Sequence, residues 1–406
     1  MIKIDNKLIL MIFLTLFNFF IFNIIDQKPL VISDDIKEYY MPLLNNFTDN
    51  LSKESDRGHY YFLERPPIFL FFLYIIKFFS NILQYEFSKT FLFFSFLSLL
   101  VINYFSFIIF RLFFKESPLD YLFIIIINFN LYNLYLFSHV NSEIIYMLLI
   151  FPSIYYFVKS NNKSDFYIIV SALLLSFATL TRPSGIFILF SILLCYFIFF
   201  KNFKNTNIKI LKFVIFYSIP IMIWQLIIIY FTNSFYFLGT MGSNYLATSL
   251  TYIIELENIE LSNYSNYTID LVYSFISNYN NRNLFNTLEF IYNNFSQNYY
   301  SFFEILFDKM IRTLNGTHSG AYSKELLVIN SIIYLIFIIN FIYLILRYKI
   351  NSGYLKVYSF LVFAIFLTSI LQVIAFTPLL RYVIPIINLI LILNFVIFNK
   401  KNLKNG

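Results

Sequence analysis

Two adjacent carboxylates, Asp34 and Asp35, stand in the first polar stretch of the chain, shortly before Glu38, Tyr39 and Tyr40. A carboxylate can accept a proton from an attacking hydroxyl, and a set of carboxylates can hold a divalent cation through oxygen. Charged residues are costly so close to apolar segments, and their presence favours a functional role. We therefore predict that the acidic pair does chemistry at a membrane surface.

Three arginines and a histidine occupy other short polar stretches. Arg65 precedes a Pro-Pro pair, Arg182 lies in a Thr-Arg-Pro-Ser-Gly stretch, and Arg381 precedes a tyrosine. A guanidinium fork pairs with two phosphate oxygens at once, so each arginine is a candidate phosphate ligand. His139 and Glu143 lie in Ser-His-Val-Asn-Ser-Glu. No second histidine or cysteine stands at ligand spacing from His139, which favours a hydrogen-bonded histidine over a metal ligand.

The composition is that of a multi-pass membrane protein. The 406 residues are 59% hydrophobic and only 13% charged, and a soluble domain carries about twice that charge fraction. Apolar runs near the length of a membrane span recur from end to end. Cys195 is the single cysteine, which excludes disulfides and cysteine-based metal sites within the chain. The net charge of +7 comes from short basic clusters between apolar runs, a pattern of topology signals rather than of nucleic-acid binding.

The basic clusters decide the topology. We predict about ten helical spans, at roughly 8–25, 90–110, 119–137, 143–159, 166–180, 185–200, 209–231, 325–346, 354–376 and 382–398. Segment 66–79 is short for a span and carries Lys77, so we place it along the outer membrane surface. With both termini cytoplasmic, the basic clusters that include Arg111, Lys204 and Lys401 fall on the inner side.

Three parts follow from this topology. The predicted catalytic transmembrane module covers 1–231 and includes an outer loop at 26–89. A large external loop covers 232–324, and its second half, 284–314, mixes apolar and charged residues as a helix on the membrane or over the outer face would. The C-terminal spans cover 325–406. The polar residues described above then gather on the outer face.

For each of these residues there is also a purely structural explanation. A loop aspartate pair can be solvated or can cap a helix that starts at Ile36. Arg182 and Arg381 can be interface anchors whose head groups reach toward lipid head groups. Pro66 can begin a helix in its first turn. Their joint occurrence on one predicted face favours a site.

The order of these motifs resembles the GT-C superfamily of membrane glycosyltransferases, in the branch of the protein mannosyltransferases and aminoarabinose transferases. The resemblance rests on the acidic pair after the first span, Arg65 with its Pro-Pro segment, Glu143, the Thr-Arg-Pro-x-Gly turn and Arg381 in Arg-Tyr-x-x-Pro. It extends from the first span to the last. Two positions depart from the family, since Arg-Pro-Pro replaces His-Pro-Pro or Lys-Pro-Pro, and Asp-Asp replaces Asp-Glu.

The resemblance implies a sugar transferred from a polyprenyl phosphate to an acceptor at the extracytoplasmic face of a bacterial or archaeal cytoplasmic membrane. In that reaction Asp34 or Asp35 is the general base. Arg381 and Arg182 are the first candidates to bind the leaving phosphate, and Arg65 is the next candidate. Four further residues are expected to support the site: Tyr39, Tyr40, His139 and Glu143.

The expected partners are the lipid-linked donor, the bilayer and a lipid, glycan or protein acceptor, without nucleic acid. Only eight glycines occur, so there is no glycine-rich cradle for a nucleotide phosphate. A divalent cation held by Asp34, Asp35 and Glu143 stays open. The alternative class is a polysaccharide polymerase or a flippase or transporter of lipid-linked glycans. Against a transporter, we find no convincing ionisable residue at mid-span and no inverted repeat of broken helices. A structural membrane subunit without activity is the third class.

Overall fold

The computed structural model describes residues 6–25, 31–32, 40–45, 61–114, 116–130, 139–160, 165–199, 206–236, 238–239, 245–255, 261–278, 284–315, 324–347, 353–375 and 384–398. These residues are almost entirely helical, which confirms the predicted helical class. One addition to that class is a parallel pairing of two short strands, β1 (Val31–Ile32) and β2 (His139–Val140). Val31 lies opposite His139, and Ile32 lies opposite Val140.

Within the described residues, ten helices fall in the predicted catalytic module. They are α1 (Asn6–Ile25), α2 (Met41–Asn45), α4 (Tyr61–Glu64), α5 (Pro67–Leu83), α6 (Phe87–Phe113), α7 (Leu119–Asn128), α9 (Glu143–Lys159), α10 (Asp165–Thr179), α11 (Gly185–Phe199) and α12 (Thr206–Thr232). The remaining elements are α13 (Tyr245–Glu255), the 3-10 helix η4 (Leu261–Asn263), α14 (Asn266–Asn278), α15 (Leu284–Asn315), α16 (Lys324–Arg347), α17 (Gly353–Ala375) and α18 (Ile384–Phe398).

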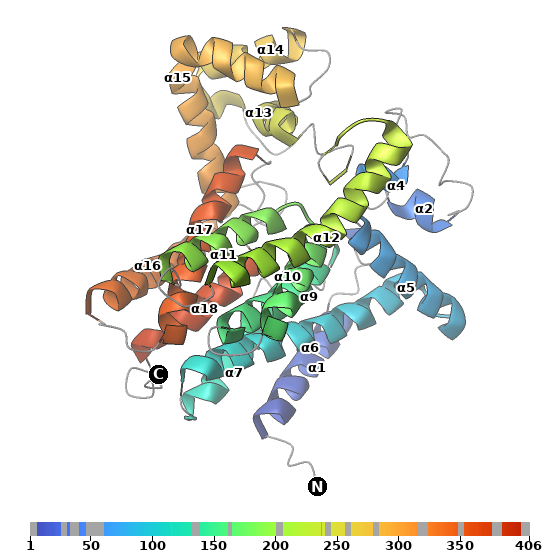
Figure 1. Cartoon of the computed structure of the whole chain (residues 1–406), viewed down its shortest axis with the longest axis vertical. Helices are drawn as coiled ribbons and strands as arrows, with labels where there is room; N and C mark the ends of the chain where they lie inside the picture. Colours follow the sequence, from blue (N-terminus) through green and yellow to red (C-terminus); the bar gives the residue numbers. More distant parts are fainter. Residues whose placement is uncertain are drawn as a thin grey trace.

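The long apolar helices pack into one bundle (Figure 1). Helix α6 contacts α1, α5 and α9, and α10 lies against both α9 and α12. On the other side of the bundle α11 packs on α17, and α18 contacts α16 and α17 as well as α6 and α7. A large hydrophobic core runs through these helices and includes Phe110, Phe123, Ile150 and Leu393.

Helix α5 corresponds to the predicted surface segment 66–79. It begins after Pro66, with Pro67 in the first turn where a missing N–H costs nothing, and it ends at Gln84 in a left-handed conformation, φ 56°. Lys77 donates to the carbonyl of Leu44 at the end of α2. The charged residue that interrupts this apolar run is therefore bonded to helix α2, which follows the acidic pair in the sequence.

A buried carboxylate, Asp120, joins the starts of α1 and α7 to the end of α6. It accepts from Lys7 Nζ at 2.9 Å and from Arg111 Nη1 at 2.8 Å. The Asp120 side chain is fully buried. Burying a charge is costly unless it is paired, and here the two cations on neighbouring helices supply the pairing.

Amides and hydroxyls join the same three helices deeper in the bundle. Asn128 of α7 accepts from Thr15 Oγ1 at 2.7 Å and from Asn103 Nδ2 at 3.1 Å through its side-chain oxygen. Its backbone carbonyl accepts from Asn18 Nδ2 at 2.6 Å. Between helices in lipid the hydrophobic effect gives no driving force for association, so hydrogen bonds of this kind help to hold such helices together.

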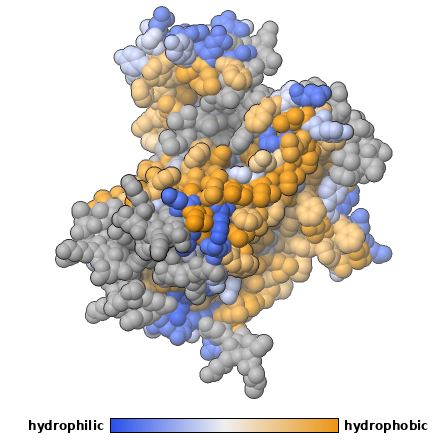
Figure 2. Space-filling view, in the orientation of Figure 1, coloured by the Kyte–Doolittle hydropathy of each residue, from blue (hydrophilic) through white to orange (hydrophobic). Residues whose placement is uncertain are grey.

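The outside of the bundle carries many apolar side chains, which is compatible with residence in a membrane. Figure 2 shows a broad hydrophobic face along α12, where Met222, Ile223 and Leu226 are exposed. A water-soluble surface rarely exposes so continuous an apolar patch. Within the described residues, two helices have the length and composition to cross a membrane, Phe87–Phe113 and Asn207–Thr232, and the other apolar helices are shorter.

Helices α13, α14 and α15 form a separate unit at one end of the bundle (Figure 1). It has small hydrophobic cores of its own, one around Phe275 and Phe290 and another around Val272 and Ile305. Helix α15 covers the predicted helix 284–314, and non-helical angles at Asn298 kink it. Its far end contacts α16 and α17, so the unit is attached to the bundle.

Candidate functional site

The β1–β2 pairing brings two predicted motifs together. Strand β1 ends one residue before the acidic pair, and strand β2 immediately precedes the turn into α9. Asp34 and Asp35 themselves lie outside the described residues. Asp34 follows Ile32 by two residues in the sequence. The chain entering the acidic pair therefore runs beside the chain entering Glu143.

A buried ion pair lies at the start of α9. Arg182 Nη1 pairs with the Glu143 carboxylate, and the two residues are 8% and 1% exposed. Arg182 Nη1 also lies 3.4 Å from Ser142 Oγ. Glu143 is in the first turn of α9, where the partial positive charge of the helix end favours a carboxylate. The structure thus brings together two residues that the sequence analysis selected separately.

The turn between α10 and α11 fixes Arg182. The Arg182 N–H donates to the Ala178 carbonyl at 2.9 Å, and the Gly185 N–H donates to the Arg182 carbonyl at 3.0 Å. A Cβ on Gly185 would lie 2.5 Å from Thr179 Oγ1 and 2.9 Å from the Thr179 backbone. Glycine is therefore needed here for the close approach of α11 to the end of α10.

The segment that carries Arg65 lies against the same turn. The Ile68 N–H donates to the Leu180 carbonyl at 3.1 Å. On its other side, Gly239 lies so close that a Cβ would be 2.6 Å from the Glu64 carbonyl. Arg65 is partly buried at this junction of α4 and α5. The Arg-Pro-Pro and Thr-Arg-Pro-x-Gly motifs therefore occupy neighbouring positions at one end of the bundle.

Asn141 lies in the same turn as His139 and Glu143 and is a further candidate site residue. It is 5% exposed, and neither polar atom of its amide has a hydrogen-bond partner within the described part of the chain. Leaving a buried amide unbonded costs about 1–3 kcal/mol. Asn141 lies between β2 and Glu143, next to the buried ion pair in the sequence. The one sequence signal was its place in the turn with His139 and Glu143.

The other predicted site residues divide into two groups. Tyr39 and Arg381, like the acidic pair, lie outside the described residues, and of His139 the structure describes the β2 backbone pairing. Tyr40 is buried with its ring edge-on to Phe69 of α5, 5.2 Å between centroids, which gives it a packing role. No three His, Cys, Asp or Glu side chains gather as metal ligands in the described ranges, which do not include the acidic pair.

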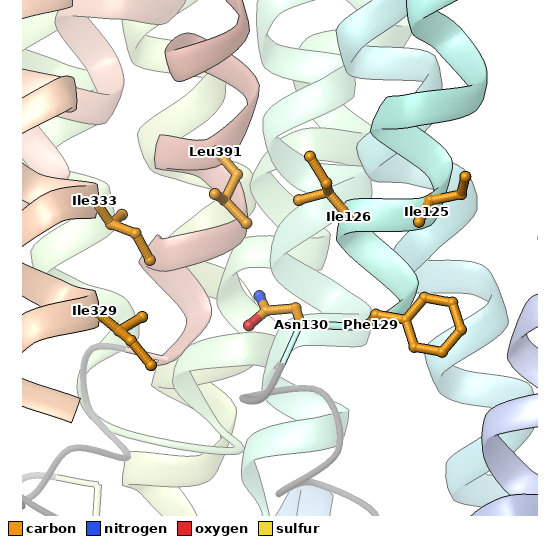
Figure 3. Close-up of a pocket in the computed structure, with 7 residues that line it drawn as sticks. All are labelled: Ile125, Ile126, Phe129, Asn130, Ile329, Ile333 and Leu391. Atoms are coloured by element: carbon orange, nitrogen blue, oxygen red, sulfur yellow. The ribbon is translucent and has the colours of Figure 1, made fainter. Parts of the chain in front are cut away.

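An apolar pocket of about 300 Å³ opens between α7, α16 and α18 (Figure 3). Its walls are formed by Ile125, Ile126, Phe129, Ile329, Ile333 and Leu391. Asn130 is the one polar residue in the lining, and its Nδ2 donates to Asn388 Oδ1 of α18 at 2.7 Å. A pocket with this lining suits a hydrocarbon chain.

Comparison of the chain with protein-family models and with curated protein sequences found no match.

Proposed function

We propose that this protein is an integral membrane glycosyltransferase that moves a sugar from a polyprenyl phosphate to an acceptor at the extracytoplasmic face. The observation that carries the proposal is the juxtaposition of β1, which leads into the acidic pair, with β2 and the buried Glu143–Arg182 pair. A carboxylate base and a phosphate-binding guanidinium are the two groups this transfer requires. Asn141, whose amide lacks a partner among the described residues, adds a group suited to a polar substrate.

In the proposed reaction, the oxygen of an acceptor hydroxyl attacks the anomeric carbon of the donor sugar. A new carbon–oxygen bond forms, and the bond between the anomeric carbon and the phosphate oxygen breaks. The hydroxyl proton passes to Asp34 or Asp35, and the second carboxylate stabilises the positive charge that develops on the sugar. The bonding electrons leave with the phosphate, which departs as polyprenyl phosphate.

The arginines balance the charge on that phosphate. A guanidinium has five N–H donors, so it can hold a carboxylate along one edge and phosphate oxygens along another. Glu143 orients Arg182 for this role, which makes Glu143 a positioning residue. Arg381 and Arg65 are the other proposed phosphate ligands, and the supporting roles of Tyr39 and His139 remain part of the proposal.

The lipid part of the donor requires the chain to span the membrane. We propose about ten spans with both termini cytoplasmic and the α13–α15 unit outside. The exposed apolar face of α12 and the apolar pocket beside α7 support a protein surrounded by lipid tails. Single cysteines introduced at positions 204 and 270, after removal of Cys195, test the topology. Labelling of position 270 from the cytoplasmic side would overturn an external site.

The proposal is tested by transfer from polyprenyl-phosphate sugars to membrane acceptors with the purified full chain in detergent. Arg182→Lys and Arg381→Lys keep the charge but lose the bidentate fork, so we expect both to lose most of the transfer. Arg111→Lys is the matched control, because Arg111 pairs with Asp120 away from the proposed site. Transfer at the parent rate by both site variants would indicate that these arginines are interface anchors and not phosphate ligands.

A further inference from the structure

The α13–α15 unit contains a pocket that the proposed transfer chemistry does not use. Its volume is about 810 Å³, within the range of ligand pockets in proteins. One wall is a face of α15, and the other is formed by Asn263 and Tyr264 in front of α14. The pocket therefore lies on the unit that the proposed topology places outside the membrane.

The α15 wall alternates aromatic and charged residues. Tyr300, Phe303 and Phe307 line the pocket and are 66%, 59% and 61% exposed. Glu304 and Asp308 each follow one of these phenylalanines directly. Residues three and four apart lie on one face of a helix, so flat apolar rings and carboxylates share a single surface.

The Asp308 carboxylate is held in a fixed orientation. Its Oδ2 accepts from the hydroxyls of Tyr252 and Tyr264, each at 2.6 Å, and from Arg312 Nε at 2.7 Å. Burial, together with these bonds to Asp308, raises the pKa of Tyr252 and Tyr264 above the usual value for tyrosine. Both phenols therefore stay protonated at neutral pH and keep donating.

The Glu304 carboxylate is held in the same way. It accepts from Ser265 Oγ at 2.8 Å, from the Ser265 N–H at 3.2 Å and from Thr268 Oγ1. Two carboxylates with restricted orientation and a set of open rings make a preorganised surface. A ligand that fits it avoids the entropic cost of ordering these groups.

The charge of the lining selects the ligand. Two carboxylates face one guanidinium, and that guanidinium already pairs with Asp308, so an anion is disfavoured. Hydrocarbon tails are disfavoured too, because they would strip water from charged groups. A sugar ring presents apolar C–H faces to aromatic rings and hydroxyl donors to carboxylates. We propose that this pocket binds a neutral sugar unit of a glycan.

We further propose that the bound glycan is the acceptor of the transferred sugar. That step rests on the proposed function, whereas glycan binding itself does not. The test is therefore binding rather than transfer. The full chain in detergent is titrated with neutral hexaoses of glucose, mannose, galactose and N-acetylglucosamine. Tetramethylammonium is the contrasting probe, because aromatic rings beside carboxylates also suit cations.

We expect at least one hexaose to bind, and Tyr300→Ala or Phe303→Ala to weaken it about tenfold, the loss of one stacking interaction. Tyr292→Ala is the matched control, since Tyr292 is exposed on the same helix but is not part of the pocket lining. Circular dichroism confirms that the variants are folded. Binding of tetramethylammonium without any hexaose, no hexaose binding, or equal affinity in all variants would each overturn the proposal.

Discussion

Asp308 in the α13–α15 unit receives three hydrogen bonds from Tyr252, Tyr264 and Arg312, all within that unit. Glu143, at the start of α9, pairs with the guanidinium of Arg182 in the turn between α10 and α11. Beside it, the Asn141 amide has no hydrogen-bond partner among the described residues. Both carboxylates are largely buried. The two surroundings differ in whether the buried polar groups near the carboxylate have hydrogen-bond partners among the described residues.

This difference supports the two proposals made above, transfer at one region and ligand binding at the other. A region whose buried polar groups are all bonded is stable and rigid, and it presents a fixed surface to a ligand. A region that keeps a buried amide without a protein partner bears a cost in stability, and such costs are typical of places where a substrate supplies the missing bonds. The contrast is therefore consistent with the proposed transfer at the α9 region and the proposed glycan binding at the α15 face.

The largest effect is expected from breaking the buried pair. Glu143→Ala leaves Arg182 buried without its carboxylate, and removing one partner of a buried pair costs about 3–5 kcal/mol. We expect this loss in the free energy of unfolding, measured by denaturation in mixed micelles. A loss below about 1 kcal/mol would mean that water reaches the pair, and the contrast with the α15 face would weaken.

The α13–α15 unit should respond to pH through Lys309. Burial lowers the pKa of Lys309 to about 7 in the folded protein, compared with an ordinary value of 10.5. Between these values the unfolded chain binds the extra proton, so the free energy of unfolding of this unit rises as the pH rises from 7 toward 10. Above pH 10 the raised pKa values of Tyr252 and Tyr264 reverse the trend, because the unfolded phenols ionise first.

Hydrogen exchange in 266–278 and 300–312, corrected for the intrinsic exchange rate at each pH, measures this stability. Lys309→Met keeps the length of the side chain and removes the titration, so its protection should not rise between pH 7 and pH 9.5. The α9 region contains no described lysine near its ion pair and serves as the internal control. Equal pH dependence in the parent and the variant would contradict the assignment to Lys309.

A smaller effect is expected where backbone segments meet beside the site. Gly239→Ala places a Cβ 2.6 Å from the Glu64 carbonyl, and Gly185→Ala places one 2.5 Å from Thr179 Oγ1. Accommodating an added methyl group typically costs about 1–3 kcal/mol. Both variants should reduce transfer as well, because they displace the turns that carry Arg65 and Arg182. Unchanged melting and unchanged transfer would show that these turns tolerate movement.

The smallest effect should come from an exposed ion pair. Lys212 and Asp165 pair at the surface, with side chains 37% and 51% exposed. Surface pairs contribute about 0–1 kcal/mol, so Asp165→Asn should lie within that range in the same denaturation experiment. A loss as large as that of Glu143→Ala would show that burial does not explain the difference between the two pairs.

Hydrophobic patterning predicted the helices well, because the bounds of an apolar helix depend on local sequence. The predicted segment 143–159 coincides with α9, and the predicted helix 284–314 is α15 within one residue. The end of the predicted span 119–137 is different, since α7 ends at Asn128 and 131–138 lies outside the described residues. Capping residues and prolines are the sequence signals of helix ends, and each of them acts only on the residues next to it.

The contacts of the site could not be predicted from the sequence in the same way. The pairing of β1 with β2 joins strands of two residues, too short to carry a strand pattern. The Glu143–Arg182 pair depends on how α10 packs on α9, which periodicity does not specify. The sequence predicts a surface helix at 284–314 but not the α15 pocket, because the second wall comes from Asn263 and Tyr264, whose packing against α15 the helical spacing does not specify.

The most direct test of the central claim replaces each aspartate of the acidic pair by asparagine, which keeps the shape and removes the charge. Adjacent residues point in different directions on either a strand or a helix, so the two should not share one role. We predict that one variant, Asp34→Asn in our preferred assignment, loses about a hundredfold or more of the transfer from polyprenyl-phosphate sugar. The other should instead lose stability or substrate binding. Transfer at the parent rate by both variants would contradict the glycosyltransferase mechanism.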